Sequence, residues 1–186
     1  MGFNISCLAC QRSDKDEFLA ALKLRETDRD DQEYEAALSY GTLGDKYLVW
    51  QNWRAGSPFD EEQLAKASEA CPILCCFISE ATMWSQVVYF LEGRVAWSLS
   101  HTSEKASDDI EVKGPVPQIW NNIVAELRQS ADAEDADSEV DYLFDAAPLL
   151  FKHLTDFKYD EVPELGFKEL EFHGSAGKKP FWKIWK

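Results

Sequence analysis

Short runs of apolar residues, each bounded by glycine, proline or charged residues, recur along the chain and have the length of β-strands. We expect strands over residues 3–10, 36–40, 46–53, 73–78, 83–91 and 94–101. The dipeptide Glu92-Gly93 separates the last two runs and is typical of a tight hairpin turn. A two-residue loop there places Leu91 opposite Arg94. In that register one face of the hairpin, which we expect to be the core face, carries Trp84, Gln86, Val88, Phe90, Val95, Trp97, Leu99 and His101.

Four segments carry the signals of amphipathic helices. The first follows Ser13, which stands three residues before an aspartate in a capping-box spacing. The second begins at Ser57, with Pro58 at the first helical position and acidic residues in the first turn. The third has apolar residues at helical spacing from 116 to 127, and the fourth begins near Pro148.

Acidic segments without an apolar period separate these elements, so we expect solvated loops. They cover residues 25–35, 103–114 and 130–140, and the second of them has room for a short strand at 110–112. The last residues, 174–186, form a basic tail in which lysines interleave with aromatic residues. Together the elements predict an α+β fold in a single domain of residues 1–186. Its mainly antiparallel sheet has about five to six strands, with about four helices packed against it.

The charge of the chain narrows the classes of partner. The 186 residues include 34 acids and 19 bases, a formal net charge of -15, and 45% apolar residues suffice for a packed core. Such a field repels phosphate backbones and anionic lipid, so we expect binding to neither nucleic acid nor membrane. The longest apolar run, 71–78, is far shorter than the ~20 residues that cross a bilayer. The odd count of five cysteines favours free thiols in a reducing compartment, so we expect a cytoplasmic protein.

Five cysteines raise the question of a metal site. Cys7 and Cys10 have the C-x2-C spacing of zinc ligands, and three further cysteines at 71, 75 and 76 could complete a thiolate set. The pair lies in an apolar strand, however, where positions i and i+3 point to opposite faces. We predict buried structural thiols, with no metal and no cofactor, and keep zinc or redox chemistry as the alternatives.

Catalytic motifs are equally sparse. The sequence contains no G-x-S-x-G, P-loop or G-x-G-x-x-G, and its histidines at 101, 153 and 173 have no metal-binding spacing. We therefore predict no catalytic residue. A composite enzymatic site around His101 is the less favoured alternative.

The amount of negative charge instead points to protein binding. A net charge of -15 exceeds the ~2 to 8 charges that keep a small domain soluble, and it would speed association with a basic partner. Two tryptophans close one predicted strand and three acids begin the next helix, so we expect aromatic surface beside carboxylates at one sheet edge. The candidate partner-binding residues are Trp50, Trp53, Asp60, Glu61, Glu62, Asp108, Asp109 and Glu111.

Four segments also carry a resemblance: MGFNIS at 1–6, KYLVWQN at 46–52, EGRVAWSLSH at 92–101 and DYLFD at 141–145. They resemble a group of small acidic bacterial cytoplasmic proteins without an assigned reaction. In general character the chain is similar to immunity proteins of polymorphic and contact-dependent toxin systems. The resemblance implies a stoichiometric inhibitor, an immunity protein or antitoxin, that binds a basic toxin or effector such as a nuclease and occludes its active site. The alternatives are a regulatory or scaffold module that binds another protein, an enzyme with a site around His101, and a DNA mimic.

Overall fold

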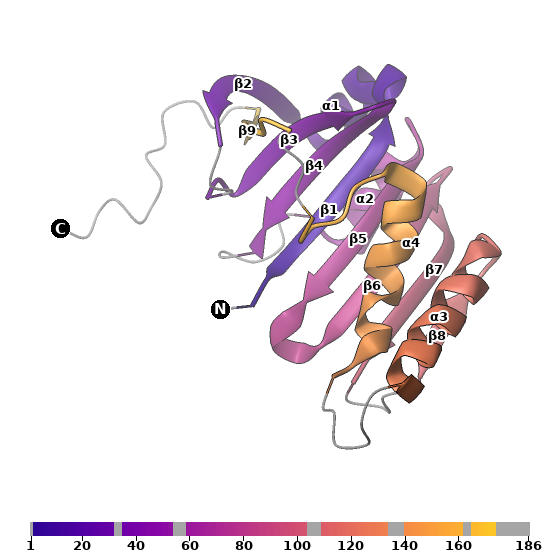
Figure 1. The fold of residues 1–186 in the computed structure, drawn as a ribbon. Helices are drawn as coiled ribbons and strands as arrows, with labels where there is room; N and C mark the ends of the chain where they lie inside the picture. Colours follow the sequence, from indigo (N-terminus) through magenta and orange to yellow (C-terminus); the bar gives the residue numbers. More distant parts are fainter. Residues whose placement is uncertain are drawn as a thin grey trace.

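The computed structural model describes residues 2–31, 35–53, 59–103, 109–133, 140–161 and 165–173. These residues form one antiparallel sheet of nine strands with four α-helices packed on its two faces (Figure 1). The predicted α+β class and antiparallel sheet are thus confirmed, and the sheet is larger than the five to six strands expected. No helix of the described segments has the length and apolar character needed to span a bilayer.

The strands are β1 (Asn4–Gln11), β2 (Leu24–Asp30), β3 (Leu38–Leu43), β4 (Lys46–Asn52), β5 (Ile73–Ser79), β6 (Trp84–Leu91), β7 (Arg94–Thr102), β8 (Ile110–Lys113) and β9 (Lys168–Phe172). The helices are α1 (Lys15–Leu22), α2 (Glu61–Ala67), α3 (Ile119–Ala133) and α4 (Ala146–Thr155), with 3-10 turns η1 (Arg12–Asp14), η3 (Glu80–Thr82) and η4 (Tyr142–Asp145). Across the sheet the strand order is β2-β9-β3-β4-β1-β5-β6-β7-β8. The predicted strands β1 and β5 therefore lie side by side near the middle.

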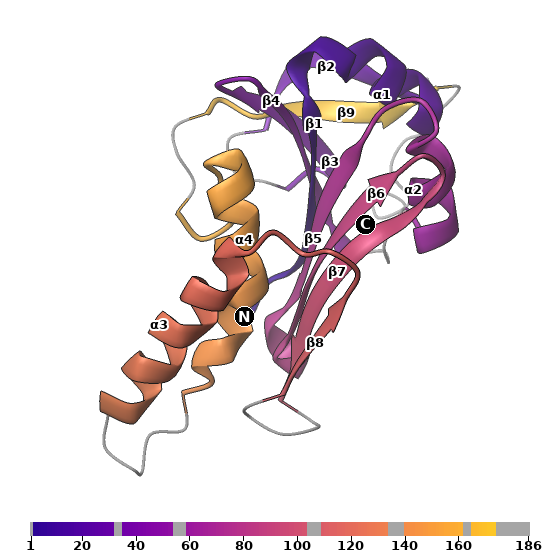
Figure 2. The same ribbon diagram turned by 90° about the vertical axis from the view of Figure 1, so that its right-hand side faces the viewer.

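Alternation along the central strands creates two separate cores, one on each face of the sheet (Figure 2). The α3/α4 core takes Cys7 of β1 and packs beneath α3, η4 and α4. The α1/α2 core takes Leu8 and Cys10 and packs beneath α1 and α2. The expectation that Cys7 and Cys10 point to opposite faces is confirmed, and all five cysteines are buried.

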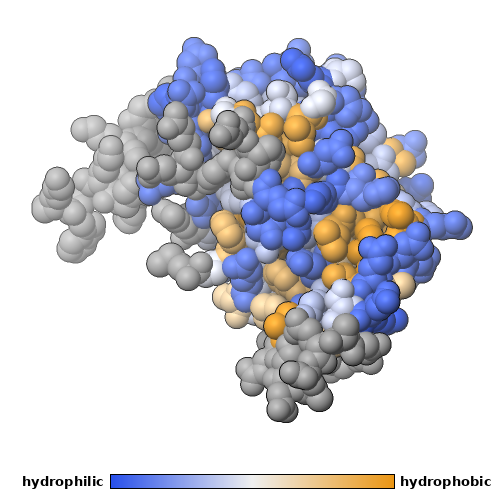
Figure 3. All heavy atoms as spheres, in the orientation of Figure 1, coloured by the Kyte–Doolittle hydropathy of each residue, from blue (hydrophilic) through white to orange (hydrophobic). Residues whose placement is uncertain are grey.

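Helices α3 and α4 lie next to each other on one face. The apolar stripe predicted from 116 to 127 faces the α3/α4 core, with Val124 as its buried member at 4% exposure. Its neighbour Ile123 is half-buried and lines a groove between α3 and α4 together with Leu149. Figure 3 accordingly shows hydrophobic residues among hydrophilic ones over these two helices. The stripe is therefore a packing surface that still reaches solvent along one side.

The segment expected as a loop at 25–35 is wrong in its first half. Residues Leu24–Asp30 form the edge strand β2, which pairs with β9 more than a hundred residues later in the chain. Two arginines of this segment pair across the sheet with glutamates of β9: Arg25 with Glu171, and Arg29 with Glu169 and Glu171. The acidic composition therefore misled the prediction, because the strand that pairs with this segment is distant in sequence.

The predicted hairpin is confirmed at its turn but not along its length. Leu91 pairs with Arg94, and Phe90 pairs with Val95. The register then shifts, so that Tyr89 pairs with Trp97 and Ala96 is left over as a β-bulge. One extra residue reverses every later side chain of β7 to the other face. As a result Trp97, Leu99 and His101 face the α3/α4 side, with Val87, and not the side of Val88 and Phe90 as predicted.

Helix starts also differ from prediction. Ser13 does not cap a helix: its hydroxyl donates to Asp14, and α1 begins at Lys15 without a side-chain cap. The second helix begins at Glu61, because Asp60 and Gln63 form a capping box there. Ser57 and Pro58 lie outside the described residues.

Two further segments extend beyond their predicted bounds or cannot be placed. Helix α3 continues through Ala133, so the acidic segment at 130–140 begins as helix, and residues 134–139 lie outside the described part of the chain. Helix α4 begins at Ala146 after η4, two residues before Pro148. The basic tail at 174–186 lies entirely outside the described residues.

Candidate protein-binding site

Helices α1 and α2 cover only one end of their face of the sheet, and the other ends of β5, β6, β7 and β8 extend beyond them (Figure 2). At these uncovered ends the face carries polar residues, including Ser100 and Thr102 on β7 and Gln86 on β6. We call this region the open sheet face. It is defined by Trp53, Phe77, Trp84, Gln86, Ser100, Thr102 and Glu111.

Three aromatic rings form a cluster on the open sheet face. The ring centroids of Trp53, Phe77 and Trp84 lie 6.1 to 6.4 Å apart in every pair, with tilted planes. All three side chains are half-buried and therefore present part of their surface to solvent. Trp53 is held in place because its Nε1 donates to Ser6 Oγ at 3.1 Å, and Ser6 in turn donates to Gln51. The aromatic cluster is thus a fixed surface of large rings.

Carboxylates border this cluster on the side of β8. Strand β8 pairs with β7 so that Glu111 lies opposite Ser100. Trp84, Asp109 and Glu111 line a hollow of about 100 Å³. Glu111 also forms an ion pair with Lys113 at 2.8 Å. An indole ring and two exposed acids therefore meet at one point of the surface.

The start of α2 adds acids near the other end of β8. Asp60 is exposed and its Oδ1 accepts from the Gln63 backbone N–H at 2.7 Å, so this carboxylate caps α2. Glu61 and Glu62 are exposed in the first turn. A hydrogen bond to Glu111, aided by the charge of Glu61, raises the pKa of Lys113. The charge of Glu61 therefore reaches Lys113 at the end of β8.

The predicted site residues are only partly brought together. Trp53, Asp109 and Glu111 meet around Trp84, and Glu61 lies near Lys113 at the same edge. Asp108 lies outside the described residues.

Trp50 is separated from this site because it faces the α3/α4 core. It is 2% exposed and makes edge contacts with Phe3 and Phe157 at centroid distances of 6.1 and 6.4 Å. Trp50 lies within β4, whereas Trp53 follows the end of that strand and packs on Phe77 and Trp84 of the other face.

Phe77 and Trp84 were not among the predicted site residues, although they complete the aromatic cluster. A signal for them exists in β7, where Ser98, Ser100 and Thr102 alternate with apolar residues. Such alternation is typical of a strand with one face open to water. Placing Phe77 and Trp84 on that open face requires the correct β6–β7 register, and the bulge at Ala96 changes this register.

His101 borders the hollow that Trp84, Asp109 and Glu111 line, but its side chain is buried. It is 1% exposed, with Nδ1 2.7 Å from the Asp109 carbonyl oxygen and Nε2 2.8 Å from Asp141 Oδ2. Both ring nitrogens are therefore engaged by protein groups. Among the described residues, no three His, Cys, Asp or Glu side chains are grouped so as to hold a metal ion.

The chemistry available at the open sheet face is recognition of another surface. Half-exposed tryptophan rings provide large apolar contacts and attract cations over their faces. The flanking carboxylates accept charge-assisted hydrogen bonds from arginine and lysine. Comparisons of the chain with protein-family models, with curated proteins and with solved structures gave no match.

Proposed function

We propose that this protein is a stoichiometric inhibitor, of the immunity-protein or antitoxin type, that binds a basic protein partner through the open sheet face. The observation that carries the proposal is that Trp84 of the aromatic cluster lines one hollow together with Glu111 of β8 and Asp109, which directly precedes β8. Trp53, Phe77 and Trp84 are half-buried and mutually packed, and Asp109 and Glu111 border the same hollow as Trp84. A binding surface of this kind combines anchoring rings with a charged border.

The rings supply the anchor. Tryptophan is over-represented among residues whose truncation costs more than ~2 kcal/mol of binding energy. The 3.1 Å hydrogen bond from Trp53 to Ser6 restrains one ring before binding, so little side-chain freedom remains to be lost. We expect the loss of these ring contacts to limit the rate at which the complex dissociates.

The acidic residues indicate that the partner is basic. With a net charge of -15 the protein attracts cations, and long-range attraction raises association rates by roughly 10 to 1,000-fold. Asp109 and Glu111 would accept from arginine or lysine side chains, one of which can also stack on Trp84. A partner whose active site binds phosphate would present such side chains, and the complex would occlude that site.

A second candidate function, a regulatory module that binds another protein without inhibiting it, uses the same surface. The two differ in what happens to the partner. An inhibitor abolishes the partner's activity at a one-to-one ratio, whereas a regulatory module leaves a bound partner active.

The test begins with the tagged full-length chain as bait in a lysate of cells that naturally contain it, with Trp84→Ala as the second bait. The captured partner is identified by mass spectrometry, purified, and measured by surface plasmon resonance at low and high salt. We expect a basic partner whose dissociation is accelerated at least ~30-fold by Trp84→Ala, corresponding to ~2 kcal/mol. Asp109→Asn with Glu111→Gln should slow association and flatten its salt dependence.

Phe3→Ala is the matched control, because Phe3 is also an exposed aromatic residue, at 42%, but contacts Trp50 and Tyr159 on the α3/α4 side of the sheet. It should bind like the wild type. Equal kinetics for wild type and Trp84→Ala would reject the open sheet face as the interface. A partner that stays fully active in the one-to-one complex would reject inhibition and favour the regulatory module.

A further inference from the structure

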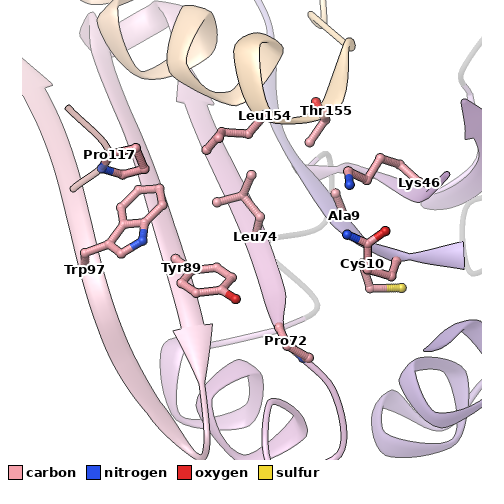
Figure 4. A pocket seen from close by; sticks show the side chains of 11 residues that line it. Ala9, Cys10, Lys46, Pro72, Leu74, Tyr89, Trp97, Pro117, Leu154 and Thr155 are labelled. Atoms are coloured by element: carbon pink, nitrogen blue, oxygen red, sulfur yellow. The ribbon is translucent and has the colours of Figure 1, made fainter. Parts of the chain in front are cut away.

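A cavity of about 350 Å³ opens on the other face of the sheet, beneath the end of α4 and the residues before α3 (Figure 4). Its walls come from β1, β4, β5, β6, β7 and α4, and all lining residues belong to the described part of the chain. The volume lies within the range of pockets that hold small molecules. The open sheet face is on the opposite side, so this cavity plays no part in the function proposed above.

One end of the cavity is aromatic and apolar. Tyr89 and Trp97 stack with centroids 5.6 Å apart and an interplanar angle of 28°. Figure 4 shows this pair along one wall, with Leu74 at the centre and Leu154 above it. A flat apolar body would bury its faces against these side chains.

The opposite end carries a positive charge. In Figure 4 Lys46 directs its amino nitrogen toward the cavity from the side facing the aromatic wall. Its side chain is only 18% exposed, and its one ion-pair partner within the described residues, Asp45, lies 3.2 Å away and is itself 75% exposed. With the Gln11 amide turned so that its oxygen accepts from Lys46 at 3.0 Å, a third donor direction of the ammonium remains.

We propose that this cavity binds a small planar carboxylate, with its ring against Tyr89 and Trp97 and its carboxylate on Lys46. Because the apolar wall and the cation lie at opposite ends of the cavity, it favours ligands that have an apolar ring at one end and a carboxylate at the other. A carboxylate in the cavity would accept a charge-assisted hydrogen bond from Lys46 in the donor direction that Asp45 and Gln11 leave open. Because the protein carries a net charge of -15, we expect Lys46 to be the residue that lets the cavity prefer a carboxylate over a neutral analogue.

The test uses indole-3-acetate and its neutral analogue indole-3-acetamide as probes of the full-length protein, measured by calorimetry and by ligand-observed NMR. We expect the carboxylate to bind at least tenfold more tightly than the amide. Lys46→Met should reduce binding of the carboxylate to the level of the amide and leave amide binding unchanged. Leu154→Trp, which fills the cavity, should abolish binding of both probes.

Lys152→Met is the matched control, because Lys152 is a more exposed lysine of α4 that pairs with Glu161 and does not line this cavity. It removes the same charge and should leave both affinities unchanged. Melting temperatures of all variants show that the fold is retained. The proposal is overturned if neither probe binds at millimolar concentration, or if Lys46→Met and Lys152→Met weaken the carboxylate equally.

Discussion

Nε2 of His101 lies 2.8 Å from Oδ2 of Asp141, and this bond joins the end of β7 to the segment that leads into η4 and α4. The histidine side chain is fully buried and that of Asp141 is 10% exposed. Ser103 donates to the same carboxylate oxygen, and the other ring nitrogen of His101 meets the carbonyl of Asp109. Both ring nitrogens thus lie within hydrogen-bond distance of protein oxygen atoms. The His101–Asp141 pair therefore links the segment before η4 and α4 to strand β7.

Removing one member of this buried pair should be costly. Asp141→Ala leaves His101 and Ser103 without their shared acceptor, and we expect a loss of about 3 kcal/mol in the free energy of unfolding. Urea unfolding followed by circular dichroism measures it. Glu126→Ala, at an exposed position inside α3, serves as the control and should change stability by less than about 0.5 kcal/mol. Identical midpoints for the two variants would show that the His101–Asp141 bond contributes nothing.

The position of His101 shows which features of the hairpin the sequence pattern predicts and which it does not. Apolar runs and the Glu92-Gly93 turn correctly predict both strands of the hairpin and the Leu91–Arg94 pair. The bulge at Ala96 leaves no hydropathy signal, because alanine is tolerated on either face of a sheet. Its consequence, the placement of His101 on the α3/α4 side of the sheet and not on the face of Trp84, could therefore not be predicted from local sequence.

Gly114 is required by that bulge. It has a φ of 73°, and a Cβ built on it would lie 2.4 Å from the carbonyl oxygen of Ala96. Gly44 in the β3–β4 turn has a similar φ of 56° but no atom within 4 Å of such a Cβ. We expect Gly114→Ala to destabilise the fold by about 3 kcal/mol or more, and Gly44→Ala by only about 1 kcal/mol. Thermal unfolding of both variants separates backbone strain from the clash, and equal losses would contradict the close packing at Ala96.

Cysteine reactivity should differ sharply among the buried thiols. Burial raises the pKa of Cys7, Cys75 and Cys76, whereas a hydrogen bond from Cys10 lowers the pKa of Cys71. The thiolate is the reactive form, so iodoacetamide at pH 8 should modify Cys71 severalfold faster than the other three. Peptide mass spectrometry of the native protein follows each site.

The hydrogen bond between the two thiols can be tested by matched variants. Cys10→Ala removes the donor and should slow alkylation of Cys71, whereas Cys10→Ser keeps a donor and should preserve it. If Cys71 reacts no faster than Cys75, or reacts alike in both variants, the thiol pair does not control its reactivity.

The sequence predicts the exposed carboxylates of the candidate site but not which aromatic residues are exposed there. Carboxylates at loops and helix starts are solvent-exposed in most folds, and Glu61, Asp109 and Glu111 are exposed as expected. Which aromatic residues reach the surface depends on the ends of the helices that cover the sheet, and this is a tertiary property. Trp84 was therefore assigned to the core, because its neighbours in the predicted register were apolar.

The two neighbouring positions of α3 provide a test of which residue the helix buries. Val124 is 4% exposed in the α3/α4 core, whereas Ile123 lines the groove between the helices and is half-buried. An unpaired charge in the core should cost at least ~3 kcal/mol, so Val124→Asp should lower stability by that amount. Ile123→Asp should lose only about 1 kcal/mol, since its carboxylate reaches water. Equal losses in urea unfolding would show that both positions are core.

The β2–β9 pairing should depend on pH through Glu171. Hydrogen bonds from Arg29 and Arg25 lower the pKa of this carboxylate below its ordinary value of 4.5. A carboxylate whose pKa is lower in the folded than in the unfolded state stabilises the fold above its unfolded pKa, and this contribution disappears as pH falls through the folded value. Glu171→Gln should therefore melt a few degrees below the wild type at pH 7, and the difference should shrink below pH 4.5. Glu126→Gln on the exposed face of α3 makes the same charge change without an arginine partner and should show no such trend. A wild-type advantage that stays constant from pH 7 to about pH 3 would mean that the arginine contacts do not bind the ionised form of Glu171 preferentially.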